Sequence, residues 1–264
     1  VQPPEDGADA LVASGKAQFG ISFQDTMAPG VVGEDALPTT AVAAVVQHNT
    51  SGIISRKGEG MDTPKGLEGK KYATWDAPIE KAMMENVVEA DGGDFSKVEL
   101  IPSTVTDEVS ALESKSVDAI WIFYAWAGVA TEVAGLETDY FAFKDINPAF
   151  DYYTPVIIGN NEFLEKEPET AKKFLSAVKK GYEDAIEDPD GAAEILCEAA
   201  PELDQELVKA SQEYLKDQYI ADADRWGYID PDRWNLFYNW LNENGLTENE
   251  IPKNTGFSNE YLPE

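Results

Sequence analysis

Val117-Asp-Ala-Ile-Trp-Ile-Phe-Tyr-Ala-Trp126 is the stretch of the sequence that decides the fold. Its first half is β-branched and aromatic without polar alternation, which is typical of a strand buried on both faces in a parallel sheet. Tyr124 and Trp126 follow at the point where such a strand ends. Large aromatic side chains at the carboxyl edge of a parallel strand are well placed for a ligand crevice. For each ring taken singly, a place in the core is the alternative.

A similar unit occurs earlier in the chain. Residues 10–23 and 111–123 each contain an Ala-Leu pair at a helix end, a turn of small residues with a lysine, and a strand. The first copy stops at Gln24, Asp25 and Thr26. The match is short, and the two stretches differ in length by one residue. It nevertheless suggests two similar lobes with a cleft between them.

The composition limits the partners of the chain. Its 264 residues, 43% of them hydrophobic, are enough for one large or two medium packed domains. Fifty acidic against 20 basic residues give a formal charge of −30, so both nucleic acid and an anionic membrane face would be repelled. The longest apolar run, residues 119–130, is shorter than the roughly 20 residues of a spanning helix. Residues 1–7 have neither a basic start nor an apolar core, so we expect no signal peptide in them.

The residues that usually carry catalysis and metal binding are scarce. Cys197 is the only cysteine and His48 the only histidine, so no internal disulfide and none of the usual zinc sites can form. We expect Cys197 to be a buried inert thiol and His48 a hydrogen-bonded structural residue. No nucleophile elbow, His-Glu-x-x-His or phosphate-cradling loop is present. We therefore expect no metal and no cofactor. Only three arginines are present, which disfavours an anionic ligand without excluding it.

Strand and helix patterns alternate from about residue 58 to 147, which predicts an α/β lobe. We assign residues 1–57 to the first part of lobe 1, residues 58–147 to lobe 2, and residues 148–264 to a return to lobe 1 with C-terminal helices.

Several side chains have the chemistry of helix N-caps. Thr26 is placed to cap a short helix near residues 27–32, and Thr106 to cap the helix that carries Leu112. Asp204 and Asp230 are placed to start two of the C-terminal helices.

Two segments resemble parts of solute-binding proteins of ABC importers in the nitrate, sulfonate and thiamine-precursor group. They are residues 63–71, Thr-Pro-Lys-Gly-Leu-Glu-Gly-Lys-Lys, and the helix pair of residues 168–193. One departure is Gly66, where many members carry Asp. More specific segments resemble the branch that binds pyrimidine precursors of thiamine. They are residues 23–29 (Phe-Gln-Asp-Thr-Met-Ala-Pro), 75–81 (Trp-Asp-Ala-Pro-Ile-Glu-Lys), 121–126, 150–155 and 257–263.

This resemblance spans essentially the whole chain and implies an α/β, two-lobed periplasmic-binding-protein-like fold of type II. Members begin with a further strand and helix, so we expect this chain to lack that unit and to be weakened or to associate as a result. The implied function is that of the extracytoplasmic solute-binding component of an ABC importer, with no enzymatic activity. Its lobes are expected to close by hinge rotation on a formylaminopyrimidine or hydroxymethylpyrimidine in the inter-lobe cleft.

The resemblance also implies partners and a location. The partners are the small heteroaromatic ligand and the permease and ATPase subunits of the importer. The location is extracytoplasmic, as a periplasmic protein or a cell-surface lipoprotein, with membrane attachment only through a lipid anchor that this chain does not contain.

The candidate ligand-binding residues follow from the same segments, because a flat, nitrogen-rich ring stacks on aromatic side chains and presents edge donors to carboxylates or amides. For stacking we select Trp75, Tyr124, Trp126 and Tyr152. For polar contacts we select Gln24, Asp25, Glu80 and Asp151, supported by Thr26, Thr50, Ser51 and Asp76. Each carboxylate could instead be an N-cap or a surface charge, and Asp25 is the strongest candidate.

Two alternatives remain open. A riboflavin receptor, or a receptor for another heteroaromatic ligand or a small anion, would belong to the same class. An enzyme is the alternative from another class, because fungal pyrimidine synthases of thiamine biosynthesis share the implied fold and consume their own histidine with iron. The chain contains His48 but lacks the cysteine-rich stretch of those synthases.

Overall fold

A computed structural model describes residues 7–103 and 105–263 of the protein, which form two compact units. Unit 1 combines the described chain up to Asn49 with Asp151–Ala192 and the described chain from Leu215 onward. Unit 2 combines the described residues of Thr50–Phe150 with Ala193–Tyr214. The expected stretch around Val117 belongs to unit 2.

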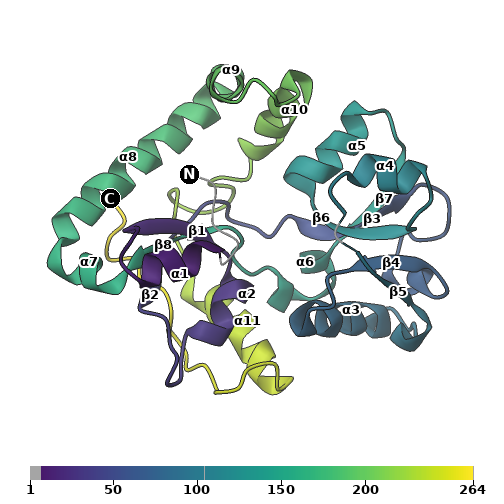
Figure 1. Ribbon diagram of the computed structural model, residues 1–264, viewed down its shortest axis with the longest axis horizontal. Coiled ribbons are helices and arrows are strands. Elements are labelled where there is room, and N and C mark those ends of the chain that lie inside the picture. Colours follow the sequence, from purple (N-terminus) through teal and green to yellow (C-terminus); the bar gives the residue numbers. More distant parts are fainter. Residues whose placement is uncertain (1–6, 104, 264) are drawn as a thin grey trace. The chain divides into compact units, whose positions relative to one another are not determined.

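Unit 2 is built on a five-stranded mixed sheet with the strand order β5-β4-β6-β3-β7 (Figure 1). The strands are β3 (Ser51–Arg56), β4 (Lys71–Thr74), β5 (Glu99–Pro102), β6 (Ala119–Phe123) and β7 (Thr138–Ala142). β4 is parallel to β5 and β6, whereas β3 is antiparallel to β6 and β7. The prediction of a strand buried on both faces is confirmed by β6, of whose five residues four are buried. The predicted parallel sheet is wrong in part, because β6 is parallel to β4 but antiparallel to β3.

Helices cover both faces of this sheet. In Figure 1, α3 lies on one face, and α4 and α5 lie on the other. Leu112 of α4 joins Ile54 and Ile120 of the sheet in one apolar cluster, while Met83 and Val87 of α3 are also fully buried. The helices of this part are α3 (Pro78–Ala90), α4 (Glu108–Glu113), α5 (Val129–Val133) and α6 (Phe143–Ile146). Two more helices cross the unit bounds and belong to this part from residue 193 to 214, namely α9 (Pro189–Ala199) and α10 (Gln205–Leu215).

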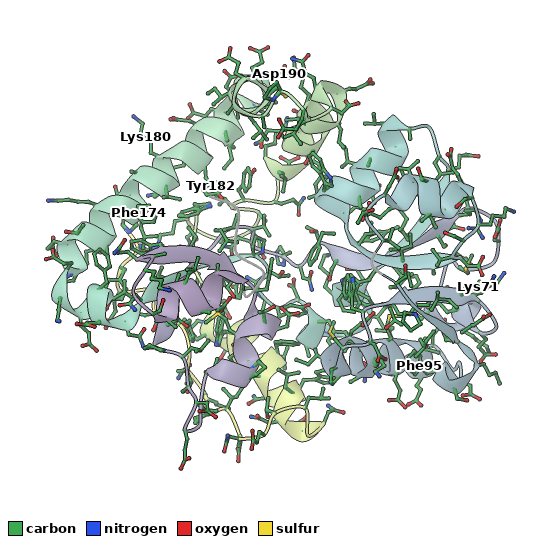
Figure 2. All side chains as sticks on the ribbon, in the orientation of Figure 1. Lys71, Phe95, Phe174, Lys180, Tyr182 and Asp190 are labelled. Carbon is green, nitrogen blue, oxygen red and sulfur yellow. The ribbon has the colours of Figure 1, made fainter. Side chains whose placement is uncertain are left out.

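Unit 1 has a three-stranded antiparallel sheet in which β8 (Val156–Asn160) lies between β1 (Phe19–Ser22) and β2 (Thr39–Ala44). The long helix α8 packs on it through Ala171 and Leu175. Figure 2 shows that Tyr182 of α8 points to the packed side and Lys180 away from it. The Tyr182 ring stacks 4.7 Å from that of Trp226. The helices of unit 1 are α1 (Gly7–Ala13), α2 (Gln24–Met27), α7 (Asn161–Lys166), α8 (Pro168–Glu187) and α11 (Pro231–Glu243).

Single helical turns complete the fold. Four are of the 3-10 type, at Ala28–Gly30, Pro64–Leu67, Phe95–Lys97 and Pro148–Phe150, and a π turn covers Tyr124–Gly128. Within the described residues, no helix combines the length and apolar character that crossing a membrane requires.

The two similar stretches of the sequence form α1 with β1 in unit 1 and α4 with β6 in unit 2, so each unit contains one copy. The unit bounds differ from those expected. Thr50–Arg56 belongs to unit 2 because β3 pairs with β6 and β7. Residues 193–214 belong there too, since Ser211 Oγ donates a hydrogen bond to the Ala125 carbonyl.

Two of the four predicted N-caps are confirmed. Asp204 accepts a hydrogen bond from the Leu207 amide, and Asp230 accepts one from the Arg233 amide. The prediction for Thr26 is wrong, because α2 begins at Gln24 and Thr26 lies inside it. The prediction for Thr106 is wrong by one residue, because Asp107 accepts the hydrogen bond from Ser110.

Candidate functional site

The predicted residues of unit 2 gather at one edge of its sheet. Parallel strands end at the same edge, and Tyr72 of β4 pairs with Ala119 of β6, so the residues after both strands lie together. β3 begins at this edge because Ser51 pairs with Phe123. The edge therefore carries the predicted residues Thr50, Ser51, Trp75, Asp76, Tyr124 and Trp126.

Aromatic rings are exposed at this edge. Trp75 is 53% exposed, Trp126 42% and Phe123 37%. The Trp75 ring lies 5.7 Å from that of the buried Trp121, at an angle of 51°. An exposed ring that packs against a buried ring is held in place and can stack on a planar ligand. Phe123 was not among the residues selected from the sequence, although its place as the last strand residue was a usable signal.

Glu80 holds the loop that presents Trp75. The Glu80 carboxylate is buried and accepts hydrogen bonds from the hydroxyls of Tyr72 at 2.6 Å and Thr74 at 3.1 Å. It also accepts from the backbone amides of Trp75 at 3.1 Å and Ala77 at 3.2 Å. With these donors its acceptor capacity is used inside the protein. Glu80 therefore positions the loop and is not available to hydrogen-bond a ligand.

Asp76 lies on the same loop in the left-handed region, with φ of 64°. Its exposed carboxylate forms a 2.8 Å ion pair with Lys81 of α3. The backbone amide of Asp76 donates to the Thr74 hydroxyl at 2.9 Å. Asp76 thus completes the tight turn that follows β4.

Tyr124 builds the turn that carries Trp126. Its hydroxyl hydrogen-bonds Glu132, and its ring packs 4.8 Å from Tyr140 and 5.4 Å from Tyr214. Burial raises the pKa of Tyr124. The Tyr140 hydroxyl donates to the carbonyl of Thr50 at 2.7 Å, and the Tyr124 amide donates to the same carbonyl at 3.0 Å. Tyr124 and Thr50 therefore stabilise this edge of the sheet through their contacts within the protein. Ser51 is fully buried beside them.

The predicted residues of unit 1 also share an edge. Ser22, the last residue of β1, pairs with Val156, the first residue of β8, so the segments after β1 and before β8 lie together. Gln24 is buried there, and its amide is used at both ends. Nε2 donates to the Trp234 carbonyl at 2.9 Å, and Oε1 accepts from the Tyr153 amide at 2.9 Å. Gln24 therefore anchors α2 and is not available to a ligand.

Asp25 carries an unpartnered polar atom at this edge. The residue is half-buried, and its Oδ1 atom is shielded from solvent with no hydrogen-bond partner among the described residues. The Tyr152 hydroxyl hydrogen-bonds the same carboxyl. Burial raises the pKa of Asp25. A buried acceptor without a donor costs free energy of about 1–3 kcal/mol, so a donor supplied by a ligand is favoured here.

The Tyr152 ring packs in the core of unit 1 instead of forming an exposed wall. It is 1% exposed and stacks on Phe237 at 4.2 Å. Only its hydroxyl reaches the candidate site, through Asp25. Thr26 is exposed on the next position of α2.

Asp151 binds residues of its own unit. Its Oδ1 accepts from the Asn49 amide at 2.9 Å, and its Oδ2 lies 2.6 Å from His48 Nδ1 and 3.3 Å from Arg233 Nη1. The expectation that His48 is hydrogen-bonded is confirmed. Arg233 also lies over the Tyr153 ring, with Cζ 4.4 Å from its centroid. Sequence analysis gave no role to Arg233, although the scarcity of arginines was a signal.

Cys197 is half-buried in α9 and not fully buried as expected. Among residues 7–103 and 105–263, no group of three or more His, Cys, Asp or Glu side chains is arranged to hold a metal ion.

Comparisons with known proteins give the family and the fold of the chain. Residues 1–192 match the family described as NMT1/THI5 like. The chain is 26% identical over 259 residues to the formylaminopyrimidine-binding protein of Halalkalibacterium halodurans, covering 94% of this chain and 76% of the relative. It is 23% identical over 275 residues to the 4-amino-5-hydroxymethyl-2-methylpyrimidine phosphate synthase THI5 of Saccharomyces cerevisiae, covering 96% of this chain and 74% of that enzyme.

The fold is that of periplasmic solute-binding proteins. The periplasmic aliphatic sulphonate binding protein SsuA from Escherichia coli superposes with a TM-score of 0.67 at 15% identity. The superposition covers 92% of this chain and 75% of SsuA. The expected type II fold is therefore confirmed.

Proposed function

The chain belongs to the NMT1/THI5-like family, and from this premise we propose that it is the extracytoplasmic solute-binding component of an ABC importer. Its proposed ligand is a pyrimidine precursor of thiamine, of the formylaminopyrimidine or hydroxymethylpyrimidine type. The similarity to a formylaminopyrimidine-binding protein over 94% of the chain supports this proposal.

The unpartnered Oδ1 atom of the Asp25 carboxyl is the observation that carries the proposal. A 4-aminopyrimidine presents an amino donor beside a ring nitrogen. A carboxyl group can accept from the amino group with one oxygen, and can share a proton with the ring nitrogen through the other. Because burial raises the pKa of Asp25, that shared proton is more readily available there than at an exposed aspartate. The orphaned acceptor of the free protein is then satisfied in the complex.

The aromatic edge of unit 2 provides the second requirement. Trp75, Phe123 and Trp126 are the exposed rings of that edge, and a pyrimidine ring is planar. Stacking on such rings contributes about 0.5–1.5 kcal/mol per pair beyond the area that is buried. Closure of two lobes on the ligand by hinge rotation stays a prediction.

Isothermal titration calorimetry with a ligand panel tests the proposal. The panel contains 4-amino-5-hydroxymethyl-2-methylpyrimidine, its formylamino analogue, thiamine, riboflavin, sulfate and an alkanesulfonate. We expect the aminopyrimidines to bind most tightly, and Asp25→Asn to weaken them at least about tenfold, since a hydrogen bond to a charged group contributes about 1.5–3 kcal/mol. Glu34→Gln, an exposed carboxylate of the same unit, is the matched control. Selective binding of riboflavin or of an anion, or an unchanged affinity in Asp25→Asn, would reject this ligand class.

The similarity to the yeast synthase favours an enzyme as the second candidate function. An enzyme of that kind would consume His48 in the presence of iron. Mass spectrometry of the peptide that contains His48, before and after incubation with iron, separates the two functions. An intact His48 together with reversible ligand binding supports the receptor. Iron-dependent loss of His48 supports the enzyme.

The permease and ATPase subunits of the importer are the proposed partners. The proposal predicts that the ligand-loaded protein stimulates the ATPase of its own importer in lipid vesicles and that the ligand-free protein does so less. Vesicles without the protein provide the baseline for this assay.

A further inference from the structure

A polar pocket of about 340 Å³ lies in unit 1 and is not used by the proposed function. Its lining is unbalanced in charge, because four carboxylates meet only two basic side chains. The six charged side chains are Asp151, Asp222, Asp224, Asp230, His48 and Arg233. A neutral histidine would leave four carboxylates with one cation, so this environment favours the charged form of the imidazole.

His48 has a carboxylate at each ring nitrogen. Nδ1 lies 2.6 Å from Asp151 Oδ2, and Nε2 lies 2.9 Å from Asp222 Oδ1. Ionised carboxylates only accept hydrogen bonds, so both contacts are satisfied together only when both ring nitrogens carry a proton. Arg233 Nη1 lies 3.0 Å from Nδ1 and donates to Asp151 Oδ2, so the guanidinium and the protonated ring share that acceptor, and the positive charge of Arg233 lowers the pKa of His48. The hydrogen bond to Asp151 raises the pKa of His48 above its usual value of 6.5.

These contacts join three segments of unit 1. His48 precedes Asn49, where the chain leaves unit 1, and Asp151 is the residue at which it returns. The Asn49 amide donates to Asp151, so the two segments are tied directly. Asp222 belongs to the loop of residues 216–230 between α10 and α11, and its side chain is 76% exposed. A neutral imidazole has only one N–H, so it can donate to only one of the two carboxylates.

We propose that His48 is a proton-operated latch. In its protonated form it fastens the loop of residues 216–230 to the two segments at which the chain passes between its units. In its neutral form it keeps the shorter contact to Asp151 and releases Asp222. Loss of the positive charge also leaves Arg233 as the one cation of the pocket among its described lining residues, so repulsion among the carboxylates favours opening of the loop.

Two other titratable groups near His48 have pKa values that are shifted away from the histidine range. The hydrogen bond from His48 lowers the pKa of Asp222. Burial raises the pKa of Tyr153, which hydrogen-bonds Arg233, to about 12. His48 is therefore the group of this cluster that titrates above pH 6.5 and below the tyrosine range.

Hydrogen exchange and NMR of the ligand-free protein test the latch. His48 is the only histidine, so its ring gives a single Hε1 signal whose pH titration is unambiguous. We expect a pKa above 6.5 that falls in Asp222→Asn. We also expect the backbone amides of residues 216–230 to exchange about two- to fivefold faster in Asp222→Asn than in the wild type, which is the effect of losing an exposed ion pair. The wild type should show the same increase when the pH rises above the His48 pKa, after correction for the intrinsic exchange rates. Asp224→Asn makes the same charge change in the same loop and has no hydrogen bond to His48, so it should leave the loop protected.

Other results would overturn the latch. They are a His48 pKa at or below 6.5, a His48 pKa equal in wild type and Asp222→Asn, or amide exchange of the loop that shows no step at the His48 pKa.

A second experiment measures ligand affinity against pH and rests on the proposed function. We expect the affinity for 4-amino-5-hydroxymethyl-2-methylpyrimidine to fall as the pH rises through the His48 pKa, and to lose this step in Asp222→Asn. Absence of binding at every pH rejects the proposed function and leaves the latch standing, whereas binding without a step rejects the coupling alone.

Discussion

At the scale of single residues, Asp25 combines a proposed binding role with a cost in stability. Its raised pKa means that the folded protein binds a proton there more tightly than the unfolded chain. For a raised carboxyl pKa, stability is highest below the unfolded pKa and falls as the pH rises through the folded pKa. Above its folded pKa, the ionised Asp25, with Oδ1 unpartnered, therefore destabilises the fold.

Asp25→Asn should raise the melting temperature at pH values above the folded pKa of Asp25, while weakening aminopyrimidine binding. We expect a gain of roughly 2–4 °C, since about 1 kcal/mol corresponds to that range for a chain of this size. The difference between variant and wild type should shrink as the pH falls towards 4. Thermal unfolding followed by circular dichroism between pH 4 and 8 measures it. A variant that is less stable than the wild type at every pH between 4 and 8 would show that the Asp25 carboxylate has enough hydrogen-bond donors in the free protein.

Glu80, unlike Asp25, has a structural role instead of a proposed role in ligand binding. Because its carboxylate accepts from four different groups, Glu80→Gln places an amide donor against other donors. We expect a loss of about 2–4 kcal/mol of stability, as for breaking a buried charged hydrogen-bond network. Glu85→Gln, on the exposed side of α3, should be within about 0.5 kcal/mol of the wild type. Urea unfolding of both variants provides the comparison, and equal stability would remove Glu80 from the support of the Trp75 loop.

Sequence reasoning placed both carboxylates at strand ends but did not distinguish their roles. Asp25 and Glu80 are each next to a predicted strand or helix start, and local pattern favours both as polar contacts for a ligand. What separates them is the number of donors, because Glu80 accepts from four groups of residues 72–77, whereas Asp25 Oδ1 has none among the described residues. The place of Glu80 at the third position of α3, where a glutamate completes a capping box, was a usable local signal, whereas the shielding of Asp25 Oδ1 depends on tertiary packing.

At the scale of elements, strands were predictable because their apolar runs are long and their ends carry turn residues. β6 and its helical partner α4 are examples. The helix starts were less predictable where two capping residues compete. Asp107 follows Thr106 directly and takes the cap, and α2 begins before Thr26 because the Gln24 amide is held by the Tyr153 carbonyl. Neither competition is visible in composition or periodicity.

The π turn after β6 depends on Gly128. A Cβ atom at this position would lie 2.5 Å from Cδ2 of the Tyr124 ring, so the ring could not keep its place. Gly128→Ala should destabilise the protein by about 1–3 kcal/mol and alter the environment of Trp126. Gly181→Ala in α8, where a Cβ atom meets no neighbour, should instead be neutral or slightly stabilising. Denaturant unfolding with near-UV circular dichroism reports both effects, and a Gly128→Ala protein with wild-type stability and spectrum would contradict the packing of Tyr124.

At the scale of the whole molecule, charge is the dominant feature. The formal charge of −30 comes from 50 acidic and 20 basic residues, so most carboxylates have no basic residue to pair with. Several of the described ion pairs are exposed, such as Lys57 with Glu137, and contribute little. Self-repulsion among like charges opposes the compact state more than the unfolded one, because folding brings the charges closer together.

Added salt should therefore stabilise this protein. Raising the ionic strength from 0.01 to 1 M shortens the Debye length from about 30 to 3 Å, so repulsion between carboxylates is screened while the apolar cores are kept. We expect the melting temperature to rise by at least about 5 °C over this range, with most of the gain below about 0.3 M, where screening changes fastest. Scanning calorimetry in sodium chloride measures it, and sucrose of equal osmolality is the control for solute exclusion, which grows linearly and does not saturate. A melting temperature that is flat or falls with salt would mean that the exposed ion pairs outweigh the repulsion, and would leave the acidic surface without a role in stability.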